Sequence, residues 1–347
     1  MKHRKRWISL LVVCVTIFMA LQILLFMGNE SNSGYKPIAH EEHQALFDAE
    51  ENGFHLLQDA MDEMIEPDDS LKQSLRMFRI AGKERSTART YVDTQREVIG
   101  IARDSLDRKY IIAPPDFPDL GRRWRPEMNI LLRLLDLEAQ FRGNDGDLQG
   151  MLDVYFDILS IGQAVTQHVR TQYPGLAPEE QWPVFHGIHK SLDSLDENQL
   201  RAVVDVLEKI EAQTAPLDRI IADEKAFAEK TRPPAILVIP FGVRINVDPI
   251  AGIVVKEGVS QTRLDGMQEA YNFNLAVVTG TLLQAKVRIY ELAHGDSPES
   301  LKELTQDGLA PIDPSTGNPF QYVGGKVVSE GPLDLSLMGV ISTSTAE

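Results

Sequence analysis

Cysteine is almost absent from this sequence: Cys14 is the only one among 347 residues, and it lies within an apolar run near the N-terminus. The chain after that run therefore has no disulfide, no thiol nucleophile and no thiolate ligand for a metal ion. Three motifs that carry chemistry are also missing, namely Gly-x-Ser-x-Gly, a phosphate-binding glycine-rich loop and His-Glu-x-x-His. These absences predict no catalytic residue, no cofactor and no metal ligand.

Positive charge is also scarce. Lys and Arg number 35 against 51 Asp and Glu, which gives a formal net charge of −16. Lys2, Arg4, Lys5 and Arg6 precede the apolar run, and removing their +4 from −16 leaves −20 on the rest of the chain. So acidic a surface repels phosphate backbones, and we expect no nucleic acid as partner.

The apolar run covers residues 7–27 and contains no charged residue. About twenty residues of α-helix cross the roughly 30 Å hydrocarbon core of a bilayer. The basic cluster before the run keeps the N-terminus in the cytoplasm by the positive-inside rule. The sequence thus predicts a single-pass protein of the cytoplasmic membrane whose C-terminal part is extracytoplasmic.

Two other interpretations of this run remain open but are less favoured. A cleaved signal peptide would have an apolar core of about 7–15 residues that ends at a small-x-small site. The run is longer, and the possible site at residues 31–33 lies beyond it. A lipoprotein would use Cys14, but Cys14 is in the middle of the run and follows Val13 rather than a small residue.

Apolar residues at helical spacing dominate the rest of the chain and predict a mostly α fold. We expect a transmembrane helix, a bundle-like exported domain and a small α+β tail with a β-hairpin. The predicted division is residues 1–27 (basic cluster and anchor), 28–40 (tether), 41–259 (helical domain), 260–338 (long helix and tail) and 339–347 (disordered C-terminus).

Prolines, glycines and capping residues set the expected helix ends. Residues 143–146 form a short turn between two helices that should pack antiparallel as the centre of the core. The expected helices cover residues 41–65, 71–80, 84–110, 128–141, 147–173, 179–195, 197–230 with a break at Pro216, and 260–294.

Residues 233–259 are apolar and rich in β-branched side chains, but Pro240 and Pro249 interrupt them. As a second membrane span they fail, because Arg244 and Asp248 would each cost about 2.5–3.5 kcal/mol near the bilayer centre. We expect an extended segment that lies against the helices, while contact with a lipid surface stays open.

The end of the chain predicts a small β structure. Gly295 should stop the long helix, and Ser297 should cap a short helix that begins at Pro298. Two strands follow at residues 320–323 and 326–329, joined by Gly324 and Gly325 as a two-residue hairpin turn.

Residues 281–332 contain Tyr-x-x-x-x-Gly-x-x-Pro-x-Ser-Leu from Tyr290, Asp-Pro-x-x-Gly-x-Pro-x-x-Tyr from Asp313, and Ser-x-Gly-Pro from Ser329. This order resembles the C-terminal part of type II secretion major pseudopilins and the tails of uncharacterised single-anchor bacterial envelope proteins. Residues 131–159 also resemble the helical hairpin of those envelope proteins. The resemblance implies an envelope protein associated with secretion- or pilus-like machinery.

The chain departs from the pseudopilins at both ends. Prepilins carry a short basic leader that ends in glycine, followed by a hydrophobic helix with a glutamate at its fifth position. This chain has neither that glycine nor that glutamate, so we do not expect a pilus subunit. In pseudopilins, acidic residues after Gly-Pro help to bind calcium. Here Leu333 follows Pro332, with only Asp334 next, so we expect no calcium site from Asp313 and Asp334.

His186 and His189 are the best candidate metal ligands, because three residues apart they share one face of a helix, with Asp193 one turn further on. No glutamate base lies between them, and we interpret them as surface or partly buried histidines. His40 and His43 of the tether carry less weight still.

Two other patterns have simple explanations. Residues 33–36 match the Ser-x-x-Lys of penicillin-recognising enzymes, but they lie in the predicted tether without the partner motifs. The carboxylates of residues 59–69 could attract cations, and we interpret them as a solvated helix end.

The leading hypothesis is therefore a non-enzymatic scaffold or interaction protein that binds envelope proteins. The alternative is an extracytoplasmic hydrolase or ligand-binding protein with a site in the helical domain. A pocket lined by several ionisable groups would favour the alternative, whereas a closed, leucine-filled bundle with an exposed apolar patch would favour the scaffold.

Overall fold

A computed structural model describes residues 40–76, 84–112, 117–168, 178–214, 217–218, 221–222, 261–305 and 308–330. All of them belong to one compact unit, Pro37–Glu347. The predicted anchor, most of the tether, residues 233–259 and residues 339–347 lie outside the described residues and stay predictions. Among the helices described, none combines the length and the apolar character that crossing a membrane requires.

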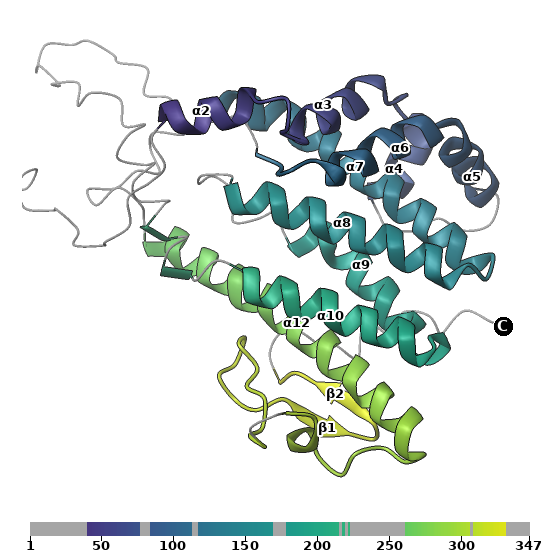
Figure 1. Ribbon diagram of the computed structural model, residues 1–347, viewed down its shortest axis with the longest axis vertical. Coiled ribbons are helices and arrows are strands. Elements are labelled where there is room, and N and C mark those ends of the chain that lie inside the picture. Colours follow the sequence, from purple (N-terminus) through teal and green to yellow (C-terminus); the bar gives the residue numbers. More distant parts are fainter. Residues whose placement is uncertain are drawn as a thin grey trace, which may run out of the picture. The chain divides into compact units, whose positions relative to one another are not determined.

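The described chain is mostly helical, with one antiparallel pair of strands near the C-terminus (Figure 1). Its helices are α2 (His40–Asp48), α3 (Phe54–Glu63), α4 (Asp69–Arg76), α5 (Glu84–Thr94), α6 (Arg96–Asp104), α7 (Phe117–Asn144), α8 (Leu148–His168), α9 (Pro178–Ser191), α10 (Glu197–Gln213) and α12 (Gln261–His294). Short 3-10 turns are η1 (Ser105–Asp107), η2 (Leu192–Ser194) and η4 (Leu301–Leu304), and the strands are β1 (Gln321–Val323) and β2 (Lys326–Val328).

Helices α7 and α8 pack along each other as the predicted antiparallel hairpin. Gly146 turns the chain with a φ of 87°, and the Asp147 carboxylate caps α8 by accepting from the Gly150 N–H at 2.9 Å. Leucines of both helices are buried: Leu131, Leu134, Leu135, Leu152 and Leu159. The hairpin is thus the centre of the core, as the leucine pattern predicted.

Helix α7 is longer than predicted. It begins at Phe117 and continues through Pro126, where we had expected a boundary. A proline removes one backbone hydrogen bond and disfavours the helix, but a long helix whose following turns are buried can tolerate that loss. Met128, two residues after Pro126, is fully buried.

The predicted helix over residues 41–65 is in fact two helices, because Asn52 interrupts it. The Asn52 side chain is 1% exposed and bonds backbone atoms of Phe47, Phe54 and Ile112. A side chain that satisfies nearby backbone groups competes with the helical pattern. Apolar spacing alone does not reveal this competition.

The predicted helix over residues 84–110 is also divided, at Gln95. This buried residue separates α5 from α6 and bonds the backbone of Ile65: its Nε2 donates to the carbonyl at 3.2 Å, and its Oε1 accepts from the N–H at 3.4 Å. The Tyr91 hydroxyl donates to the same carbonyl at 2.9 Å. Gln95 therefore holds the link between α3 and α4.

Helices α10 and α12 pack along each other and against the rest of the bundle. Asp196 and Gln199 form a capping box at the start of α10. This helix ends at Gln213 and Thr214 is extended, which agrees with the predicted break at Pro216. Residues 217–218 and 221–222 are helical again, and the predicted end at residue 230 lies outside the described residues. Helix α12 has the predicted bounds within one residue, and Gly295 ends it with a φ of 81°. The division into domains at residue 260 stays a prediction.

The C-terminal hairpin forms where it was predicted. Gly324 and Gly325 have φ values of 59° and 79°. Positive φ at both central residues is the requirement of a type I′ two-residue turn. Tyr322 pairs with Val327 across the strands. The cap of the short helix was predicted wrongly: η4 is capped by Ser300 with Glu303, while the Ser297 hydroxyl donates to Glu291.

The hairpin packs against the C-terminal half of α12 (Figure 1). Phe320 is 6% exposed, and it joins Val327, Leu283 and Val287 in one apolar core shared with the helical bundle. Tyr322 is partly buried on the same side. The predicted inward side of the first strand is therefore confirmed.

Candidate functional site

The tail, residues 295–305 and 308–330, has an inner side on α12 and an outer side. Side chains alternate between the two sides of a strand, and directly paired residues share a side. Because Phe320 and Tyr322 point inward, Pro319, Gln321 and Val323 point outward. Pairing with these three adds Ile312, Val328 and Lys326. We call these six residues the outer face.

The outer face is largely exposed and combines four apolar residues with Gln321 and Lys326. Ile312 is 53% and Val323 is 60% exposed, and the three residues Pro319, Gln321 and Lys326 are exposed as well. Five large apolar side chains are strongly exposed in the described part of the chain: Ile65, Leu292, Leu309, Ile312 and Val323. Three of them, Leu309, Ile312 and Val323, lie in the tail, and Leu292 lies in the last turn of α12 just before it.

Helix α12 holds the hairpin through the side-chain amide of Gln284. Its Nε2 donates to the Gly325 carbonyl at 3.1 Å, and its Oε1 accepts from the Val327 N–H at 2.8 Å. These are the free backbone groups on the outer edge of β2, which an additional strand would otherwise bond. The amide therefore closes this edge and fixes the hairpin on the helix.

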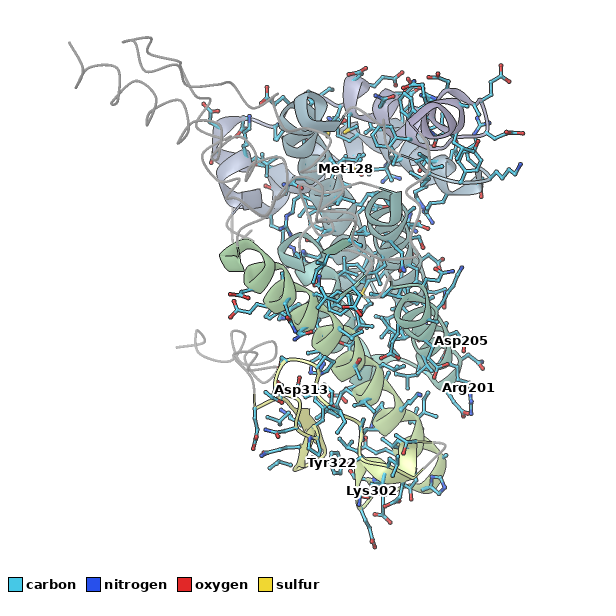
Figure 2. All side chains as sticks on the ribbon, turned by 90° about the vertical axis from the view of Figure 1, so that its left-hand side faces the viewer. Met128, Arg201, Asp205, Lys302, Asp313 and Tyr322 are labelled. Carbon is cyan, nitrogen blue, oxygen red and sulfur yellow. The ribbon has the colours of Figure 1, made fainter. Side chains whose placement is uncertain are left out.

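Asp313 is buried and holds the loop before β1. Its carboxylate accepts from the Ser315 N–H at 2.8 Å, the Ser315 hydroxyl at 2.6 Å and the Ser329 hydroxyl. Figure 2 shows Asp313, Tyr322 and Lys302 together in the tail. Asp313 thus ties the loop to β2, and its oxygens are occupied by protein donors, while Asp334 lies outside the described residues.

The histidine pair of α9 is placed beside acidic and basic groups. His189 is partly buried, and its pKa lies below the ordinary value because of burial, then the neighbouring His186 and Lys326. Asp193, on η2, has a mostly exposed side chain and lies 3.8 Å from Arg288 Nε. Among the residues described, no three His, Cys, Asp or Glu side chains are grouped to hold a metal ion.

The remaining candidates from the sequence are the carboxylates of residues 59–69, residues 33–36 and the histidines of the tether. Asp68 caps α4 by accepting from the Leu71 N–H at 2.8 Å, and Glu66 pairs with Lys72. The acidic residues 59–69 are thus a helix end and a capped link, as interpreted. Residues 33–36 lie outside the described part, as do the side chains of His40 and His43.

Sequence reasoning missed a buried polar residue in the bundle. Asp136 of α7 is 6% exposed; its Oδ2 accepts from Gln140 Nε2 at 3.0 Å, and its Oδ1 has no hydrogen-bond partner. The signal was present: Asn129, Arg133, Asp136 and Gln140 recur at spacings of four and three, one face of a helix that is otherwise leucine-rich. Because the helix is rich in leucine, it was interpreted only as part of the apolar core.

Comparison with protein-family models, with curated proteins and with solved structures found no match for this chain. Any function must therefore be argued from the residues themselves.

Proposed function

We propose that this chain is a membrane-anchored, extracytoplasmic scaffold or interaction protein, and that the outer face of its tail binds another envelope protein. The observation that carries the proposal is the concentration of exposed apolar side chains on the tail, where Ile312 and Val323 are both more than half exposed. Exposed apolar patches of this kind mark protein contacts more often than chance placement.

Rigidity beneath the outer face supports the proposal. Gln284 fixes β2 on α12, and Asp313 fixes the loop that carries Ile312. Phe320 and Val327 anchor the inner side in the common core. A surface that is already ordered loses little conformational entropy when it binds, which favours its use as a docking surface.

The closed interior supports a scaffold over an enzyme. The bundle is filled by leucines and other apolar residues, and Asp136 is enclosed there. The alternative, a hydrolase or ligand-binding protein, requires several ionisable groups that converge on an accessible pocket.

Charge sets the kind of partner. The chain without its four basic N-terminal residues carries −20, and the tail contains Glu299, Glu303 and Glu330 together with Lys302 and Lys326. Complementary potentials speed association and select partners. The partner surface should therefore have an apolar centre and a rim of Lys and Arg. Association with secretion- or pilus-like machinery rests on the resemblance of residues 281–332 to pseudopilin tails.

Co-purification from detergent-solubilised membranes tests the proposal. The parent should retain specific envelope proteins, and the double variant Ile312→Ser, Val323→Ser should lose most of them. Ile65→Ser is the matched control, because Ile65 is 61% exposed but lies outside the tail. Equal recovery by the parent and the double variant would overturn the assignment of the outer face.

Topology is tested separately. A reporter that fluoresces only in the cytoplasm, fused after Glu347, should be dark, and an exported phosphatase at the same position should be active. The reverse result would contradict the orientation predicted from Lys2, Arg4, Lys5 and Arg6, and with it the extracytoplasmic location.

A further inference from the structure

Asp136 is a carboxyl group in the interior of the bundle. It lies on α7, between buried Leu135 and Leu137, and is 6% exposed. One oxygen accepts a hydrogen bond from Gln140, and Oδ1 has no partner. An ionised carboxylate requires more hydrogen bonds than this when it leaves water, whereas a neutral carboxyl is much cheaper to bury.

The groups around Asp136 favour its charged form less than burial disfavours it. On α7 these are the Gln140 amide and the positively charged Arg133, which lies one turn earlier. On α8 the neighbour is Tyr155, whose burial raises its own pKa well above the ordinary value, so that it stays a neutral hydroxyl. The buried residues of α3, which also packs on α7, are apolar. Helix α5 packs on α7 as well, and its Arg89 pairs with Asp145 at 2.8 Å.

Helix α9 closes this region. A Cβ at Gly187 would overlap the ring and hydroxyl of Tyr155, so the two helices approach as closely as a glycine permits. Val184, Phe185 and Ile188 of α9 are buried as well. On the side of α9, the space beside Tyr155 is therefore filled by protein.

We propose that Asp136 is a proton-binding site that keeps α7 packed against α8 and α9 while it is protonated and loosens this packing when it ionises. The released proton goes to solvent, and water entering between the helices solvates the carboxylate. The element responds to the pH of the compartment that surrounds the bundle. That this compartment is extracytoplasmic rests on the proposed function; proton binding itself does not.

The direction of the pH effect and the pH range in which it occurs follow from the burial of Asp136. Desolvation raises the pKa of Asp136 from 3.8 to about 6, against the lowering effects of Gln140 and Arg133. A raised pKa in the folded state means that stability is complete below the unfolded pKa and is lost as pH rises through about 6. Between pH 5 and pH 7.5 the opening equilibrium should rise about tenfold.

Amide exchange of α7 and α8 in the intact chain tests the proposal. The protection of each variant is divided by that of the parent at the same pH, which cancels the intrinsic exchange rates. In the parent, opening should rise about tenfold from pH 5 to pH 7.5 relative to Asp136→Asn. Asp136→Leu should behave like Asp136→Asn, which covers the case in which the amide variant folds poorly. Asp153→Asn, an exposed residue on α8 bonded to Gln149, should behave like the parent.

Two results would overturn the proposal. One is an equal pH dependence in the parent and in both Asp136 variants. The other is an equal loss of that dependence in Asp153→Asn. Neither involves a partner protein, so failure here is distinct from failure of the co-purification experiment.

Discussion

The side chain of Asn52 bonds both backbone groups of Ile112: Nδ2 donates to its carbonyl at 2.8 Å, and Oδ1 accepts from its N–H at 2.8 Å. Gln95 does the same for Ile65, and Gln284 does so for Gly325 and Val327. We call these three residues the amide clamps. Each one fixes a non-helical segment on a helix or helix end through hydrogen bonds from one side-chain amide.

Asn52→Ala should destabilise the fold strongly. The change leaves the Ile112 N–H and carbonyl without their partner in the interior, at about 1–3 kcal/mol for each unsatisfied group. We expect a loss of about 3 kcal/mol or more in the free energy of unfolding, measured by urea denaturation. Gln44→Ala is the control, because Gln44 bonds only the exposed Asp48, and it should cost less than about 0.5 kcal/mol.

Gln284→Ala should loosen the hairpin and leave the bundle folded. It removes two hydrogen bonds to the edge of β2, and we expect a local loss of about 1–3 kcal/mol. Amide exchange at Val327 should quicken, while exchange in α7 and α8 stays as in the parent. Gln321→Ala, on the exposed side of β1, should leave Val327 protected; equal exchange in both variants would remove Gln284 from this role.

Phe320→Ala should release the tail to proteases. Phe320 is buried against α12, and truncation of a buried phenylalanine costs about 3–5 kcal/mol. Limited proteolysis should cut the tail of this variant faster than that of the parent. Val323→Ala, on the outer face, should digest at the parent's rate. Unchanged digestion of Phe320→Ala would mean that the tail does not depend on this contact.

His189 should make the protein less stable in acid, opposite in sign to Asp136. Its pKa is lowered by burial, His186 and Lys326, so its contribution is present above the ordinary histidine pKa and is lost as pH falls through the lowered value. His189→Gln should therefore lose less melting temperature than the parent between pH 7 and pH 5. His294→Gln, an exposed histidine stacked on Tyr290, should follow the parent.

We expect the purified protein to retain no stoichiometric zinc or calcium after dialysis, and its melting temperature to be the same with and without chelator. The described residues contain no group of three possible ligands. Elemental analysis with a melting scan checks this. Near-stoichiometric metal, or a large loss of thermal stability in chelator, would contradict it and make His186, His189, Asp313 and Asp334 the first ligands to test.

The sequence predicted those parts of the fold that depend on strong local signals. Repeated leucines and the turn at Gly146 were sufficient for the α7–α8 hairpin, and the paired glycines 324 and 325 were sufficient for the β-hairpin. Phe320 and Tyr322 are two residues apart, so strand alternation places both side chains on the same side of the strand. That side is apolar and was therefore expected to face the core.

The sequence could not predict features that depend on distant partners. Nothing near Asn52 indicates that Ile112, sixty residues later, needs its amide, so the helix break was invisible. The burial of Asp136 was likewise not predicted, because the leucines around it gave no sign that this polar residue is covered as well. The outer face became visible only when the pairing of Ile312 with Pro319 fixed its direction.

The Asn52 clamp also bears on chemical ageing. Asn52 is followed by Gly53, and in an unfolded chain an Asn-Gly pair deamidates readily, because the glycine nitrogen attacks the side-chain amide to form a succinimide. Here that nitrogen donates its hydrogen to the Tyr110 carbonyl at 2.8 Å, and the amide is held by the Ile112 backbone. The folded chain thus protects this Asn-Gly pair, and a chain that has deamidated while unfolded carries a carboxylate that can no longer donate to Phe47 and Ile112.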